Sequence, residues 1–178
     1  MTNPIPKIAE LIEQHLGVRT SRTENVARAL QEAGQLPRGG PFTPPDFDRD
    51  DTVRLLVAVA TGAKLADVAA ATTATLAAVP GGADITSAPL SVPRNSEIQL
   101  GVLAGMAIDG DTLDGLTIEV VHGWPEVAVK WKDGVTQRLQ AVGTIPNHQP
   151  GHQGRIATTI PGPAFAHIIK EACSGQSN

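Results

Sequence analysis

The chain has 178 residues, of which 41% are hydrophobic and 18% are charged, and its formal net charge is −4. This composition is typical of a folded protein with one domain or two small ones, and it excludes a chain that coats nucleic acid with its whole surface. The single cysteine, Cys173, excludes an intrachain disulfide and a cysteine-based zinc site, which fits a reducing cytoplasm. Because no apolar stretch reaches transmembrane length and no signal-peptide pattern occurs, we expect a cytoplasmic protein without a membrane partner.

The first predicted element is a helix over residues 5–16, whose apolar residues recur at helical spacing. Gly17 ends this helix, because glycine readily adopts the left-handed conformation that closes a helix. A second helix follows after a short turn and ends at Gly34, and Ser21 and Glu24 near its start fit a capping box. Helix, short turn and helix in this order predict a helix-turn-helix.

One side of the second predicted helix carries side chains suited to DNA. Residues 18–40 contain four arginines against two glutamates, so this segment is positive although the whole chain is negative. A short helix with hydrogen-bond donors on one face suits entry into the major groove. A bundle helix whose arginines only face water explains the same pattern, and both interpretations stay open. The candidate DNA-binding residues are Arg19, Thr20, Ser21, Arg22, Thr23, Asn25, Arg28 and Arg38.

Two further helices are predicted before the middle of the chain, one within residues 44–61 and a long Ala- and Thr-rich one over residues 64–79. Four aspartates at the start of the earlier helix favour the positive end of its dipole, which explains them without a metal or catalytic role. A Gly- and Pro-rich linker over residues 81–95 then predicts a domain boundary. It separates a helical, DNA-binding domain of residues 1–80 from a β-rich dimerisation or partner-binding domain of residues 96–178.

The second half of the chain changes from helical to strand periodicity. Residues 97–106 fit a helix and a strand equally well. Strands are predicted over residues 116–121, 126–132, 135–142 and 155–160, and a final helix over residues 164–172. We therefore predict an α+β protein, in which an N-terminal helical bundle with a helix-turn-helix precedes a small antiparallel sheet with a terminal helix.

The residue patterns give no support for a catalytic site. The chain contains no Gly-x-Ser-x-Gly sequence, phosphate loop or dinucleotide fingerprint. Residues 109–115 begin like a calcium loop, but no glutamate stands at the twelfth position. His148 and His152 are four residues apart, but a proline and a glycine between them exclude the helix on which such zinc ligands usually lie. We expect no metal, no cofactor and no enzyme activity.

The run Val-Ala-Arg-Ala-Leu-Gln-Glu-Ala-Gly-Gln-Leu-Pro-Arg-Gly-Gly at residues 26–40, with residues 51–60 downstream, resembles the amino-terminal part of small proteins of phages and prophages. More loosely, it is similar to helix-turn-helix regulators. The resemblance covers residues 5–61 and implies a sequence-specific, phage-type transcriptional regulator that binds double-stranded DNA as a homodimer. It implies base recognition by Thr20, Ser21, Arg22, Thr23, Asn25 and Arg28, with Arg19 and Arg38 near phosphates.

Two other classes of function fit the same sequence. In a phage assembly or DNA-packaging protein, residues 5–79 would form an oligomeric helical bundle. In a small-ligand or protein-binding module, the β-rich half would carry the function. The DNA interpretation requires that the polar side of the second helix lie at the protein surface, where it can meet a polyanion.

Overall fold

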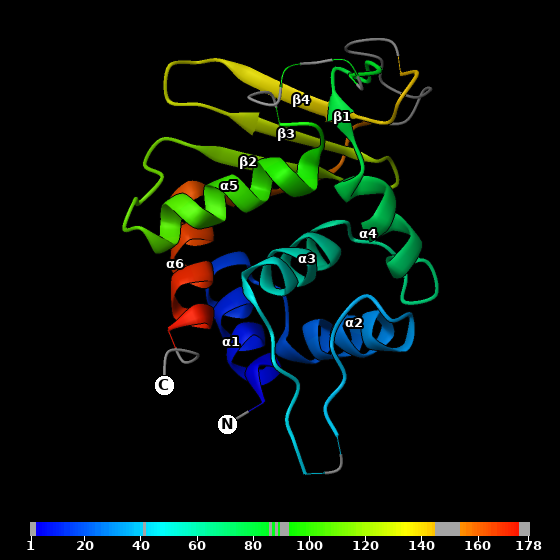
Figure 1. The fold of residues 1–178 in the computed structure, drawn as a ribbon, viewed down its shortest axis with the longest axis vertical. Coiled ribbons are helices and arrows are strands. Elements are labelled where there is room, and N and C mark those ends of the chain that lie inside the picture. The colour runs from blue at the N-terminus through cyan, green and yellow to red at the C-terminus, as the bar shows by residue number, and fades with distance from the viewer. Residues whose placement is uncertain are drawn as a thin grey trace.

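The computed structural model describes residues 3–40, 42–85, 87, 89, 93–144 and 154–174. In these residues, helices precede and then cover one antiparallel sheet, so the predicted α+β class is confirmed (Figure 1). The helices are α1 (Pro4–Leu16), α2 (Thr20–Glu32), α3 (Arg49–Ala60), α4 (Val68–Leu76), α5 (Ser96–Ile108) and α6 (Gly162–Cys173). The strands are β1 (Val79–Pro80), β2 (Thr117–Val121), β3 (Glu126–Lys130), β4 (Thr136–Gln140) and β5 (Ala157–Pro161).

The turn between α1 and α2 forms where the glycine signal predicts it. Gly17 has φ +68° and its backbone N–H donates to Glu13 O over 2.9 Å, which closes α1. The predicted capping box at Ser21 is wrong, because Arg19 occupies the capping position, two residues earlier, and no side chain caps the helix. At the other end, Gly34 has φ +73° and follows the last turn of α2 as predicted.

The aspartates near residue 50 cap a helix, and α3 lies within the predicted residues 44–61. The backbone N–H of Asp51 donates to Asp48 Oδ1 over 2.8 Å, and that of Asp48 donates to Asp51 Oδ2 over 3.1 Å. This reciprocal capping box sets the start of α3 at Arg49. The predicted long helix over residues 64–79 is shorter, since Lys64 and Asp67 form a turn before α4 and Val79–Pro80 pairs with β4.

The sheet has the strand order β1-β4-β3-β2-β5, and every neighbouring pair is antiparallel. The register pairs Ile118 with Val129 and with Ile160, which places these side chains on one face of the sheet. All three are buried, so this face is covered by the helices. Residues 97–106, which fitted a helix and a strand equally, belong to α5.

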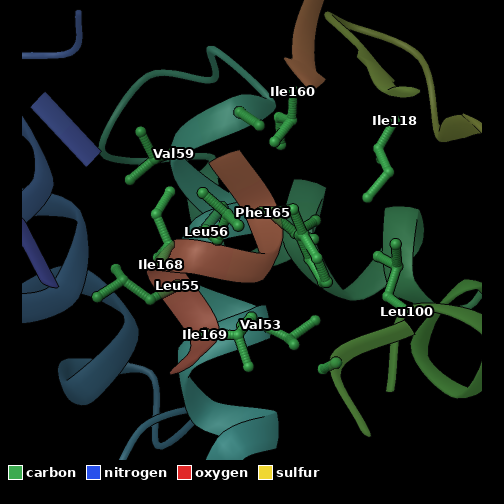
Figure 2. Packing of buried hydrophobic residues seen from close by; sticks show 14 of the residues in the cluster. Val53, Leu55, Leu56, Val59, Leu100, Ile118, Ile160, Phe165, Ile168 and Ile169 are labelled. Carbon is green, nitrogen blue, oxygen red and sulfur yellow. The ribbon is translucent and has the colours of Figure 1, made fainter. Parts of the chain in front are cut away.

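The hydrophobic core is built around α3, which contacts α2, α4, α5 and α6. Leu55 and Leu56 of α3 are fully buried, and Figure 2 shows them beside Phe165 and Ile168 of α6. Each such side chain contributes roughly 2 kcal/mol through its buried apolar area. A single cluster of buried residues contains side chains from both sides of the Gly- and Pro-rich segment, so the two halves of the chain share one core.

Gly162, at the junction of β5 and α6, has less room for an added Cβ atom than any other glycine in the described chain. The backbone N–H of Gly162 donates to Leu116 O over 2.7 Å. A Cβ atom at this position would lie 2.1 Å from Leu113 O and 2.9 Å from Leu116 O. Only glycine therefore allows α6 to start directly against the backbone that precedes β2.

None of the helices in the described ranges combines the length and the apolar character that a membrane crossing demands.

Candidate nucleic-acid interface on the second helix

The polar side of α2 lies at the protein surface. Its apolar stripe, formed by Val26, Ala27 and Leu30, is fully buried against the rest of the helical half. On the opposite side Ser21, Asn25 and Arg28 are exposed; they are four and three residues apart and therefore follow one line along the helix. The geometric requirement of the DNA interpretation is thus met by these side chains.

Thr23 belongs to the buried side of α2, which corrects its assignment as a DNA-reading residue. Its relative exposure is 0%, and its Oγ1 has no hydrogen-bond partner in the described part of the chain. The reason is helical periodicity, because position 23 lies three, four and seven residues before the buried stripe. The sequence did not indicate that Thr23 is buried, because its hydroxyl group is equally typical of a polar surface residue.

Arg22 is half-buried and holds α2 to the rest of the protein. Its Nη2 donates to the backbone O of Ala63, in the connection between α3 and α4. Ala63 also lines a cavity of about 390 Å³ between this connection, α4 and the β2–β3 turn, together with Trp124 and His122. Arg22 therefore has a structural role that its place on the polar face did not indicate.

Arg38 is exposed but lies against the end of α2. Its Nε donates to Gln31 O over 2.6 Å, while Gln31 Nε2 donates to Pro37 O over 2.7 Å. These bonds satisfy one carbonyl group in the last turn of α2 and one after the helix, and they match a cation to the negative end of its dipole. Thr20, at the other end, is half-buried as the first residue of the helix.

Arg19 and Arg28 are exposed, and neither makes an ion pair or side-chain hydrogen bond within the described ranges. Glu24 and Glu32, also exposed, lie four residues before and after Arg28 on the helix. The two carboxylates weaken the positive field that Arg28 presents to a polyanion. Of the eight candidate residues, the four exposed and uncommitted ones are Arg19, Ser21, Asn25 and Arg28.

The histidines do not gather into a metal site within the described residues, where no group of three or more His, Cys, Asp or Glu side chains is placed to hold a metal ion. His122 Nε2 lies 2.8 Å from Thr158 Oγ1, and His167 pairs with His15. His148 and His152 lie outside the described residues.

Sequence reasoning missed a cluster of charged side chains on the sheet. Glu119, Glu126, Lys130, Arg138 and Arg155 come from four segments and meet through hydrogen bonds and ion pairs. Polar residues, some of them charged, recur at every second position in the predicted strands, as Thr136, Arg138 and Gln140 do, and this alternation was the available signal. Which of them face one another depends on strand register.

Comparisons with known proteins assign the chain to no class. No family model, no curated protein and no solved structure matches it. Its function therefore has to be argued from its own surfaces.

Proposed function

We propose that the protein is a sequence-specific DNA-binding protein that contacts double-stranded DNA through the exposed side of α2. The observation that carries this proposal is the position of Arg28 and Asn25, which face solvent from one side of a short helix and have no partner in the described chain. The resemblance to phage-type regulators supports the same function, with the protein acting in the cytoplasm on transcription.

The exposed side chains have the chemistry that base edges require. An arginine donates two hydrogen bonds to the O6 and N7 atoms of guanine, and an asparagine pairs with the N6 and N7 atoms of adenine. Arg28 and Asn25 supply these two groups, three residues apart on the helix. Arg19 precedes the first turn of α2, where unpaired backbone N–H groups favour phosphate. It would fix the position of the helix on the DNA backbone.

An apolar surface on α5 supports the proposed homo-oligomer. Ile98, Val102 and Ile108 are all exposed on this helix, although apolar side chains of that size are normally buried. Contact between the α5 helices of two copies would remove them from water. A dimer would also present two α2 helices to two half-sites, which is how helix-turn-helix proteins reach their usual specificity.

The same α5 surface also fits a second candidate function, a phage assembly or DNA-packaging protein, although α5 lies outside residues 5–79, which the sequence analysis expects to form the helical oligomer. The two functions differ in what α2 does. A regulator needs Arg28 to bind DNA, whereas an assembly protein should keep its oligomeric mass in solution when Arg28 is replaced. Solution mass measured together with DNA binding separates these two candidates.

The direct test is selection of bound fragments from a pool of short random-sequence duplexes, followed by affinity measurements on the selected sequence. Arg28→Ala should weaken binding by about tenfold or more, because a bidentate base contact contributes roughly 1–3 kcal/mol. The matched control is Lys132→Ala, which removes an equal charge from the exposed turn between β3 and β4. Equal losses in the two variants, or no selected sequence, would contradict the proposal.

A further inference from the structure

The outer face of the sheet, opposite the helices, carries a set of charged side chains that we call the outer-face cluster. Its members are Glu119, Glu126, Lys130, Arg138 and Arg155. The register aligns Glu119 with Ala128 and Ala128 with Arg138, so residues on three adjacent strands project from the same face. The cluster is therefore a product of strand pairing.

Two carboxylates hold the cluster together. Arg155 bridges them, with Nη1 at 2.7 Å from Glu119 Oε2 and Nη2 at 3.0 Å from Glu126 Oε1. Lys130 Nζ donates to the other oxygen of Glu119. Although burial alone would raise the pKa of Glu119, the hydrogen bonds from Lys130 and Arg155 lower it, so this carboxylate stays ionised at neutral pH.

Arg138 is a third cation beside these two anions. Its Nη1 lies 3.7 Å from Glu126 Oε1, which is too long for a hydrogen bond. Glu126 is otherwise occupied, since its Oε2 accepts from the fully buried Gln140 Nε2 over 2.9 Å. The cluster thus has three positive groups and two negative ones, in a chain whose net charge is −4. Arg155 Nε, which is buried, also lacks an acceptor in the described residues.

Arg138, the cation in excess, borders a hollow of about 500 Å³ at the β4 side of the sheet. Arg138, Lys130 and Thr136 line this open hollow, together with Pro80 of β1 and Gly81, which follows it. The register places Thr136 directly opposite Lys130, so a hydroxyl and an ammonium group are neighbours there. The volume lies within the range of small-molecule sites in proteins.

We propose that this hollow binds a small molecule through a phosphate or carboxylate group, which Arg138 holds with help from Lys130 and the Thr136 hydroxyl. An oxyanion balances the third cation and accepts the guanidinium N–H groups that Glu126 does not reach, in the bidentate geometry that arginine favours. The site is distinct from α2, and the inference does not depend on DNA binding.

The test uses the full-length protein labelled with ¹⁵N and titrated with pyrophosphate, with succinate, and with neutral 1,4-butanediol. Saturable shifts in the backbone amide signals of residues 136–140 are expected with one or both anions, which identifies the preferred group, and none is expected with the diol. Arg138→Gln should weaken anion binding by about tenfold, in line with loss of a charged hydrogen bond. Arg138→Lys should keep part of the affinity.

Lys132→Gln is the matched control, because it removes one exposed charge on the neighbouring turn and should leave anion affinity unchanged. Amide dispersion in the same spectra reports whether each variant is folded. Shifts confined to the first turn of α2, equal effects of the two charge-removing variants, or no saturable shift with either anion would each overturn the inference.

Discussion

His15 Nε2 and His167 Nδ1 lie 2.9 Å apart, and this contact joins α1 to α6. The rings meet edge to face, with their centroids 4.9 Å apart. Such a bond needs one nitrogen to donate and the other to accept, so it is lost when both rings carry a second proton. Burial, and after it the charge of His167, lower the pKa of His15.

We expect the protein to lose stability as the pH falls below about 6.5, the ordinary pKa of histidine. Because the pKa of His15 is lower in the folded state, the unfolded chain binds more protons in this range, and acid favours unfolding. Thermal unfolding followed between about pH 8 and about pH 5.5 measures this loss. His167→Asn should make the dependence shallower, and an unchanged slope in that variant would contradict the explanation.

Arg22 and Arg28 should respond differently to removal, although both are arginines on the polar side of α2. Arg22→Ala loses the hydrogen bond to Ala63 O and the packing of the half-buried side chain, so unfolding should become easier by about 1 kcal/mol. Arg28→Ala, at an exposed position, should change stability by less than about 0.5 kcal/mol. Chemical denaturation of both variants is the measurement, and equal changes would refute this division of roles.

Thr23→Val should leave DNA affinity unchanged and make the protein more stable by up to about 1 kcal/mol, because the buried hydroxyl has no partner. Thr72→Val is the control, since Thr72 is equally buried but its Oγ1 donates to Val68 O over 2.6 Å. The control variant should be less stable than the parent protein. If Thr23→Val lost DNA binding but kept its stability, Thr23 would contact DNA after all, which would contradict its assignment to the buried side of α2.

Gly162→Ala should destabilise the protein by about 3 kcal/mol or more, because the new methyl group would overlap two backbone carbonyl oxygens. Gly17→Ala serves as the comparison. That position has φ +68° but no atom within 4 Å of the added Cβ, so only backbone strain of about 1 kcal/mol opposes the change. Thermal unfolding ranks the two variants, and a smaller effect at position 162 would mean that α6 can shift away from β2.

Local signals in the sequence were sufficient for the order of most elements. The apolar spacing of α1 and α2, the glycines that end them, and the period-two strands of the second half are properties of neighbouring residues, and the structure confirms them. The start of α3 was less predictable, because several aspartates near it could serve as the cap. Tertiary contacts were needed to identify α5 as a helix, since its side chains are apolar on nearly every side.

By itself the sequence determined the α+β class and the apolar stripe of α2, because helical and strand periodicity act over a few residues. Only the tertiary structure decided that Thr23 is buried, that Arg22 reaches Ala63 and that Arg138 lies beside Glu126. Each of these relationships depends on which surfaces meet when helices pack and strands pair. The free energy of that packing is shared among residues far apart in the chain, so no local pattern records it.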